Sequence, residues 1–592
     1  MRRCRSESEG FKPMKRIFLT DFGIAPDTGE DLLPALKKAI EAANESPDGC
    51  EIIFENGIYD IYPDNLTPLD IHVSNTHSEE EGESITRSFA ILFNRCRNIV
   101  LNGSGAVLRF HGKMSLIGII ESENIEIKNL ELSTVHPPLT EMTVISQGDG
   151  YIDCRVHPDS LYRIKNRKIE WYGENFAFSS GISQLFDPES GITWRAFSPM
   201  QDENAVWEEL SAGILRIHYV EKNGTNPYMA KVGYVFQMRN PFRDECGILL
   251  SGSDNITVSN TTVHFMHCMG FLAQNSSNIT ADGFCVLPER GRTAAASSDI
   301  LHFSGCRGKV SIKNGCFKGA HDDAVNIHGT HLVITESRAQ SNEITVKFMH
   351  PQTFGIGGFK VNDRIAAINP DSLLAKGEAE VTQVCELSAR EIRLALKGDI
   401  SAFKEGFAVE NISAMPEVEI KDNYFERIPT RGILVTSGKR VRIENNIFNR
   451  IKGCGILIAD DAKSWFESGR VCDAAVKNNV YRNSGGPFVR IAPENTEYAG
   501  AVHKNISVTD NEIFFERNSN EIFSHINPWT VKQNNVIFEA RCAENIRFAD
   551  NRIFGEENEC VLRLEKCDFS DISDNVFAGK IAVEKTDCEM DK

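Results

Sequence analysis

The chain has 592 residues, and its 64 Lys and Arg against 83 Asp and Glu give a net charge of −19. This acidic balance argues against sequence-independent binding of DNA or RNA, which depends on clustered Lys and Arg. Apolar residues make up 41% of the sequence, enough for a large core, and no stretch approaches the roughly 18 apolar residues of a membrane span. We therefore expect an acidic, soluble globular protein with no membrane span.

The N-terminal residues are basic but lack the apolar segment of a signal peptide, so the cellular compartment stays open. We expect residues 1–13 to be disordered or a start-site artefact. Sixteen cysteines show no C-x-x-C spacing, which predicts mostly free, buried thiols rather than a zinc site or a disulfide framework. Residues 32–45 (LLPALKKAIEAANE) form an amphipathic pattern, and a helix there is predicted to cap the repeat described next.

A short pattern, Asn-Ile-x-apolar-x-(Asn or Asp)-(Asn or Gly), recurs along the chain. Most of its apolar anchors are 23–33 residues apart, the length of one coil of a three-sided parallel β-helix. Each unit reads as a short strand that ends at Asn or Gly, which tolerate the left-handed backbone of a corner. A leucine-rich repeat is disfavoured because its Leu-x-x-Leu-x-Leu spacing is absent. The sequence predicts an all-β, right-handed parallel β-helix with anchors at Leu101, Ile127, Val258, Ala281, Ile312, Ile420, Ile443, Val476, Val508, Phe548 and Ile572.

Two intervals between anchors are far longer than one coil. They leave insertions of roughly 105 residues after Ile127 and roughly 80 residues after Ile312. Both contain strand-like runs separated by turn residues, so we predict two inserted antiparallel β-barrel-like domains that wall a cleft. The expected organisation after residue 13 is capped β-helix over 14–132, insertion over 133–245, coils over 246–333, insertion over 334–414 and coils over 415–592.

Aligning the coils on their final glycines brings acidic residues together. Asp299 falls over Asp323, with Arg431 in the next coil. Adjacent coils are about 4.8 Å apart, so Asp299, Asp322 and Asp323 are predicted to cluster at one sheet edge beside both insertions. Carboxylates this close cannot all ionise freely, so one pKa should rise and supply an acid while the others activate water. An acid and a base about 6.5–9.5 Å apart, with water between them, is the inverting-glycosidase arrangement.

Further residues are predicted to bind substrate in the same cleft. Asn326 and His328 lie on the outward face of their strand. Trp465, with Asp461 and Glu467 beside it in a lengthened loop, fits a sugar subsite that combines a ring face with hydroxyl acceptors. The residues alone leave open an Asp-Asp turn that only satisfies corner amides, a loop that packs its tryptophan against the solenoid, and a calcium site.

These motifs resemble a known family. Ser298-Asp299, residues 321–329 (HDDAVNIHG), 431–435 (RGILV) and 461–469 (DAKSWFESG) are similar to glycoside hydrolase family 110 of the pectate-lyase-like β-helix superfamily. Its members are bacterial exo-acting α-1,3-galactosidases that invert configuration. The resemblance implies removal of terminal α-1,3-linked galactose from branched blood-group-B-type glycans or from linear α-galactose termini.

By the matching positions, the resemblance implies that Asp322 is the general acid and that Asp299 and Asp323 hold the attacking water as base. It also implies sugar contacts for Arg431, Trp465 and Glu467, no metal or other cofactor, and a partner that is an oligosaccharide or glycoconjugate with terminal α-galactose.

Three other functions stay open. They are a polygalacturonase-like hydrolase, whose Arg-Ile-Lys motif is replaced here by Arg431-Gly-Ile, a calcium-dependent polysaccharide lyase, and a non-catalytic glycan-binding β-helix.

Overall fold

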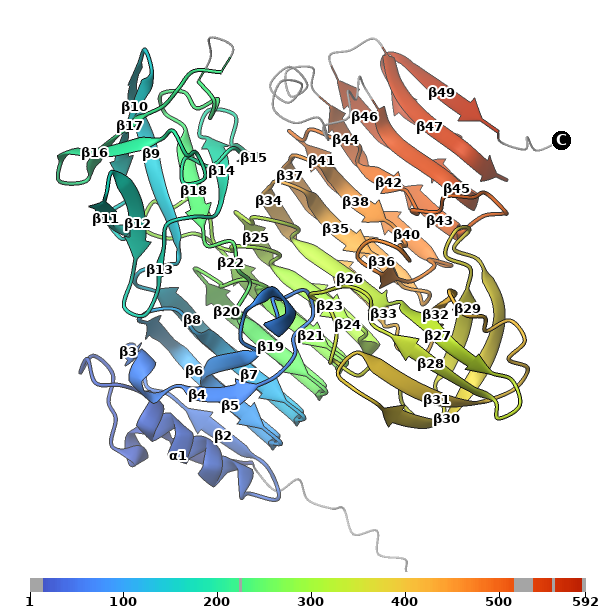
Figure 1. Ribbon diagram of the computed structural model, residues 1–592, viewed down its shortest axis with the longest axis horizontal. Helices are drawn as coiled ribbons and strands as arrows, with labels where there is room; N and C mark the ends of the chain where they lie inside the picture. Colours follow the sequence, from blue (N-terminus) through green and yellow to red (C-terminus); the bar gives the residue numbers. More distant parts are fainter. Residues whose placement is uncertain (1–13, 223–225, 516–535, 556–558, 588–592) are drawn as a thin grey trace, which may run out of the picture.

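The computed structural model describes residues 14–222, 226–515, 536–555 and 559–587 (Figure 1). The expected disordered segment 1–13 lies outside these residues. Within them the chain winds into a parallel β-helix, whose strands stack coil upon coil in three sheets (Figure 1). The predicted fold class is confirmed.

One sheet, the anchor sheet, contains the repeat anchors. Its neighbouring coils pair the anchors from Leu101 with Ile127 through to Val508 with Phe548. The pairing of Ile127 with Val258 and that of Ile312 with Ile420 span the two insertions without a change of register. Its strands are β2 (Cys50–Ile53), β6 (Arg97–Phe110), β8 (Glu123–Thr134), β20 (Asp254–Val263), β22 (Ser277–Val286), β24 (Arg307–Lys313), β33 (Glu417–Lys421), β36 (Val441–Glu444), β40 (Ala474–Lys477), β43 (His503–Thr509) and β45 (Val536–Ala549).

A second sheet, the site sheet, carries the predicted acidic cluster at one edge. Its strands are β5 (Thr86–Asn94), β7 (Ser115–Ile120), β19 (Ile248–Ser251), β21 (Phe271–Gln274), β23 (Leu301–Ser304), β26 (Val325–Thr330), β35 (Arg431–Val435), β38 (Cys454–Ile458), β42 (Val489–Ile491), part of β45, β47 (Glu559–Asp568) and β49 (Lys580–Thr586). The third side includes β25 (Cys316–Lys318), β34 (Tyr424–Ile428), β37 (Ile447–Ile451), β41 (Val480–Arg482), β44 (Glu512–Phe515), β46 (Arg552–Gly555) and β48 (Val576–Phe577).

Asparagines form the corners between these sheets. The Asn that opens a repeat adopts the left-handed conformation, with φ of 56° at Asn98 and 55° at Asn255. At another corner, a buried ladder runs through the C-terminal coils: Asn446 Nδ2 donates to Asn479 Oδ1 at 3.0 Å and to the Ile420 carbonyl at 2.9 Å. Because each rung satisfies the next, the ladder holds only when the coils are in register. Its members are Asn423, Asn446, Asn479, Asn511, Asn551 and Asn575.

Helix α1 (Leu33–Asn44) covers the N-terminal end of the stack, where it packs against β2, β5 and β6 (Figure 1). The apolar side chains predicted to face the coils are buried, with Leu33 fully covered and Ile40 only 7% exposed. The helix therefore caps the end of the core, as the sequence predicts. In the part of the chain that the structure describes, no helix combines the length and the apolar character needed to span a membrane.

The first insertion consists of two antiparallel sheets around a core of its own, with Trp171, Trp194 and Trp207 buried. One sheet has the order β15-β14-β18-β9-β10-β17-β16, and the other has the order β11-β12-β13. The strands are β9 (Leu139–Gly148), β10 (Tyr151–Val156), β11 (Leu161–Lys165), β12 (Lys168–Tyr172), β13 (Ala177–Phe178), β14 (Ile182–Asp187), β15 (Ile192–Ala196), β16 (Val206–Ser211), β17 (Ile214–His218) and β18 (Val235–Arg239).

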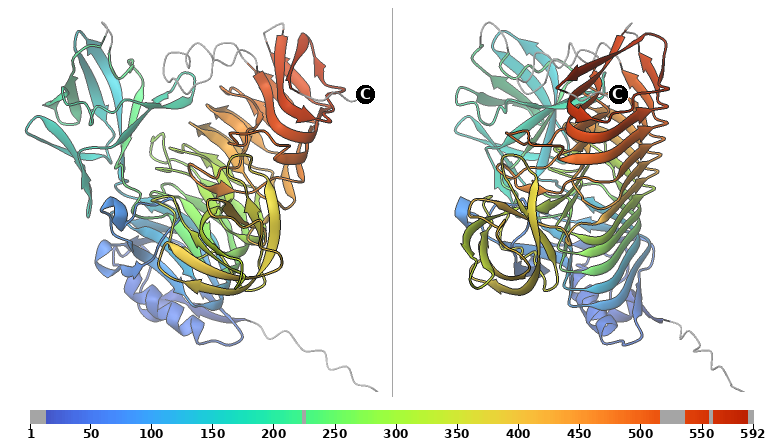
Figure 2. Two further views of the ribbon diagram at one scale, coloured as in Figure 1. Left: turned by 45° about the vertical axis from the view of Figure 1, so that its right-hand side comes forward. Right: turned by 90° about the vertical axis from the view of Figure 1, so that its right-hand side faces the viewer.

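The second insertion is a closed six-stranded barrel in the order β27-β28-β31-β30-β29-β32. Both insertions project from the same flank of the coil stack (Figure 2, right). The strands of the barrel are β27 (Leu332–Arg338), β28 (Glu343–Lys347), β29 (Arg364–Ile368), β30 (Ala375–Glu386), β31 (Glu391–Lys397) and β32 (Ala408–Asn411).

We expect Asn446→Ala to lower the free energy of unfolding by about 1–3 kcal/mol, because it leaves buried amide and carbonyl groups of two neighbouring coils without partners. Urea unfolding followed by circular dichroism measures the change. Lys439→Ala, at an exposed loop position of the same region, is the control and should shift stability by less than about 0.5 kcal/mol. Equal stability of the two variants would contradict the role given to the ladder.

Candidate active site

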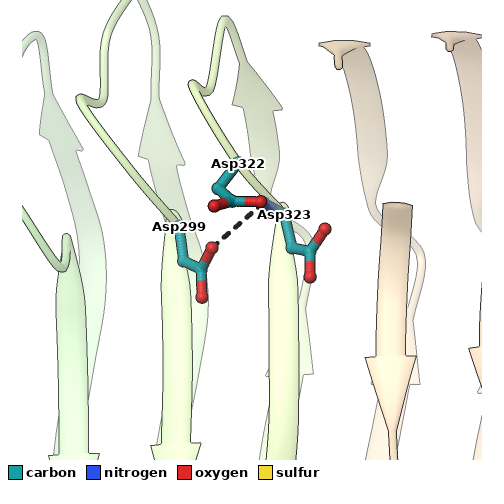
Figure 3. A group of neighbouring side chains, drawn as sticks. All are labelled: Asp299, Asp322 and Asp323. Carbon is teal, nitrogen blue, oxygen red and sulfur yellow. Dashed lines mark hydrogen bonds between the residues drawn. The ribbon is translucent and has the colours of Figure 1, made fainter. Parts of the chain in front are cut away.

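The acidic cluster lies where strands β23 and β26 of the site sheet begin. Leu301 pairs with Val325 and His302 with Asn326, which sets Asp299 beside Asp323 in the neighbouring coil. The backbone N–H of Asp323 donates to Asp299 Oδ1 at 3.0 Å (Figure 3). The predicted coil register at the cluster is therefore present, and Asp322 completes the group.

The three carboxyl groups are closer than the sequence-based expectation. Each offers an oxygen atom, and these oxygens all lie within 4.8 Å of one another. The expected separation of about 6.5–9.5 Å between acid and base is thus wrong as a description of this cluster. The reason is the coil spacing of about 4.8 Å, which sets the distance between side chains at the same position of adjacent coils.

Asp323 is the most enclosed member, with 1% of its surface exposed. Its Oδ1 accepts the backbone N–H of Arg431 at 3.0 Å and the hydroxyl of Thr430, and its Oδ2 faces Arg431 Nη2 at 2.7 Å. Burial raises the pKa of Asp323 to about 8, with Arg431 acting in the opposite direction. Arg431 therefore occupies the predicted position next to the cluster.

Asp322 is bound by two arginines from outside the coil. Its Oδ2 accepts Arg195 Nη2 at 3.0 Å, from strand β15 of the first insertion, and Arg243 Nη2 at 3.4 Å. Burial favours the protonated form, but Arg195 and Arg431 outweigh it, so the pKa of Asp322 lies below its ordinary value. In the ligand-free protein Asp322 is therefore the ionised member of the cluster.

Asp299 is nearly fully buried and contacts a histidine. Its Oδ2 lies 2.9 Å from His302 Nδ1, and His302 Nε2 lies 3.0 Å from His328 Nε2. Burial, together with the neighbouring Asp322, raises the pKa of Asp299 to about 7. The cluster therefore contains a protonated carboxyl near neutral pH, as expected for carboxylates this close.

The cluster opens into a pocket of about 550 Å³ including its mouth, within the usual range of ligand sites. Asn326 and Glu467 line it, and Asn326 Nδ2 donates to Glu467 Oε1 at 3.3 Å. Trp465, 42% exposed, also lines the pocket, and its ring stacks on His350 of the barrel with centroids 4.3 Å apart. The tryptophan thus contacts the barrel and faces the pocket, rather than packing against the solenoid.

Two of the predicted substrate-binding residues are placed elsewhere. Asp461 is 6% exposed, and its carboxylate accepts the backbone N–H groups of Lys463, Ser464 and Phe466, so it shapes the loop instead of lining the pocket. His328 is 2% exposed and lies behind the pocket wall, between His302 and the Gly329 carbonyl. A direct sugar contact is therefore not available to either side chain in this structure.

The sequence analysis missed four residues of the site: Asn75, Arg195, Arg243 and His302. The first three line the pocket from segments outside the aligned coils, so the repeat pattern contains no signal for them. His302 does belong to the pattern, since it stands in register with Asn326, and its place three residues after Asp299 is the signal that could have identified it.

Comparison with known proteins places the chain in a family. Models described as GLAA-B beta-barrel domain I and domain II match residues 140–233 and 343–405. Alpha-1,3-galactosidase A of Bacteroides thetaiotaomicron is 37% identical over 84% of this chain and 87% of its own length. The chain belongs to the bacterial α-1,3-galactosidase family.

Other relatives agree with this assignment. Alpha-1,3-galactosidase A of Akkermansia muciniphila is 34% identical over 74% of this chain and 73% of its own length. Alpha-1,3-galactosidase B of Bacteroides thetaiotaomicron is 27% identical over 95% of both chains. The predicted membership of glycoside hydrolase family 110 is confirmed, and with it the prediction that this α-1,3-galactosidase family member is a glycoside hydrolase.

The raised pKa of Asp299 predicts a pH dependence of stability. A carboxyl whose pKa is raised in the folded state contributes stability that is present at low pH and is lost as pH rises through the folded value. Relative to Asp299→Asn, the wild-type protein should lose up to about 1.4 kcal/mol of unfolding free energy per pH unit between about pH 4 and the folded pKa of about 7. Urea unfolding of both proteins across this range measures the difference, and parallel stability curves would contradict the raised pKa.

Proposed function

We propose that the protein is an exo-acting, inverting glycoside hydrolase that removes terminal α-1,3-linked galactose from glycans. The observation that carries the proposal is the cluster of Asp299, Asp322 and Asp323 at the base of a pocket with an exposed tryptophan face. Membership of the α-1,3-galactosidase family supports the sugar and the linkage. Branched blood-group-B-type and linear α-galactose termini are the two substrate classes to compare.

In this proposal Asp322 is the general acid. It is the one cluster member with appreciable exposure to the pocket, at 16% of its side chain, so it can reach a glycosidic oxygen. A sugar that displaces Arg195 from Asp322 removes the charge that keeps its pKa low, while the burial that favours the protonated form increases. The acid thus takes up its proton as substrate binds.

Asp299 and Asp323 hold the attacking water in the proposed mechanism. They stand side by side in adjacent coils, deeper than Asp322, and the water then lies beside the cluster rather than between two facing carboxylates. Asn326, whose side-chain oxygen is buried without a partner, and Glu467 offer acceptors to sugar hydroxyls, and Trp465 offers a ring face. Arg431 fixes Asp323.

Asp322→Asn should lower kcat on an α-1,3-linked galactose disaccharide by about 10²–10⁴-fold, because the leaving sugar needs a proton. With 4-nitrophenyl α-galactoside the loss should be at least tenfold smaller, since nitrophenolate leaves without one. Asp153→Asn, which removes an arginine-paired carboxylate in the first insertion, is the matched control and should keep full activity. An equal loss on both substrates would contradict the acid assignment.

Proton NMR of the first turnovers should show β-galactose before α-galactose, because direct attack by water inverts the anomeric centre. α-Galactose as the first product would contradict the proposed mechanism. A parallel screen of α1-3, α1-4 and α1-6 galactosides and of polygalacturonate tests the linkage, and cleavage of polygalacturonate alone would favour the polygalacturonase-like alternative.

Removal of divalent cations with EDTA should change kcat by less than about twofold. Arg195, Arg243 and Arg431 already place positive charge against the carboxylates, so the cluster does not need a cation to balance its charge. Activity assays after dialysis against EDTA, with calcium added back to one sample, measure this. Loss of activity that calcium restores would revive the calcium-site interpretation.

A further inference from the structure

A chain of hydrogen bonds runs from Asp299 into the interior, away from the pocket. Asp299 Oδ2 lies 2.9 Å from His302 Nδ1, His302 Nε2 lies 3.0 Å from His328 Nε2, and His328 Nδ1 lies 2.6 Å from the Gly329 carbonyl oxygen. Both imidazoles are buried, at 0% and 2% exposure. Water therefore does not supply alternative partners for these nitrogens.

The last contact of the chain fixes the direction of the others. A carbonyl oxygen only accepts, so His328 Nδ1 carries a hydrogen. With a neutral His328, its Nε2 accepts from His302 Nε2–H, and His302 Nδ1 is then a lone pair that faces Asp299. Asp299 must donate in this state, so it holds a proton. Burial lowers the pKa of His302 to about 3, which agrees with a neutral ring.

A second arrangement uses the same heavy-atom positions. Asp299 passes its proton to His302 Nδ1, and His302 passes its Nε2 hydrogen to His328 Nε2. The products are an Asp299 carboxylate, a neutral His302 of the other tautomer and a His328 imidazolium. Glu467 Oε1 lies 3.6 Å from His328 Nε2 and can balance the new positive charge.

Charged groups surround both ends of this chain. Arg243 and Arg431 favour the carboxylate form of Asp299, whereas Asp322 opposes it. At the other end, Glu467 faces the two histidines, and His328 lowers the pKa of Glu467 against the effect of burial. Each of the two proton positions therefore has a counter-charge nearby, which keeps their free energies close.

We propose that His302 and His328 form a proton relay that converts Asp299 from a protonated carboxyl into the base of the hydrolytic reaction. This proposal rests on the proposed function. Once the proton is on His328, Asp299 takes a proton from the attacking water while Asp322 gives one to the leaving oxygen. Solvent in the pocket then returns a proton from Asp299 to Asp322, and His328 keeps its own throughout turnover, so protons balance.

The pH profile of kcat/KM tests the relay in the full-length protein. In His302→Phe, Asp299 can release its proton only to solvent, so the acidic limb should move up by at least one pH unit. Activity at about pH 5 should fall at least tenfold and recover as pH rises. His328→Gln should show the same shift. A loss that is equal at all pH values, or an unshifted limb, would overturn the proposal.

Two further variants separate proton transfer from packing. His503→Phe makes the same substitution at an equally buried histidine, which accepts the Val471 N–H at 3.1 Å away from the site, and should leave the pH profile unchanged. His302→Gly opens a cavity of imidazole size, and added imidazole should restore at least a tenfold part of the lost activity at about pH 5. Absence of rescue in the folded protein would count against the relay.

Infrared spectroscopy tests the relay without any substrate, so failure of the proposed function and failure of the relay are distinguishable. The difference between wild type and Asp299→Asn should contain a carboxylic acid band that disappears as pH rises. In His302→Phe this band should persist to a pH at least one unit higher. An identical midpoint with and without His302 would overturn the relay even if galactosides are cleaved.

Discussion

The register of the coils is the constraint on which the rest of the structure depends. A strand of this repeat is too short to bury its own face, so it is stable only against the same face of the coils above and below. Side-chain ladders such as the one through Asn423, Asn446 and Asn479 satisfy buried amides only when successive coils align. Displacement of one coil by a single residue would break these bonds and turn core residues outward.

The active site is a direct product of that register. Carboxylates repel one another, and a flexible chain would separate them. Here the stacking of β23 on β26 holds Asp299 and Asp323 together, because moving them apart would break the core contacts of Leu301 and Val325. The cost of this crowding appears as raised carboxyl pKa values and is offset by Arg431 and by the two arginines on Asp322.

The sequence predicted those parts of the molecule that repeat. Equal spacing of anchors is enough to align coils, so the pairs Asp299 with Asp323 and Leu301 with Val325 could be found before any coordinates. Residues that reach the pocket from elsewhere could not: Arg195 comes from a strand of the first insertion, and its position depends on how that domain packs. Asp461 shows the opposite error, since an acidic side chain near a predicted subsite proved to bind loop amides.

The pairing of Ile127 with Val258 and of Ile312 with Ile420 shows that whole domains enter the chain between two coils while the stack continues undisturbed. The solenoid thus separates two tasks in space. Its coils hold the reacting groups, and the inserted domains contribute Arg195 and His350 to the rim of the pocket. During evolution, an insertion could therefore be lengthened, replaced or rotated so that a differently branched glycan is admitted, without moving a single carboxylate.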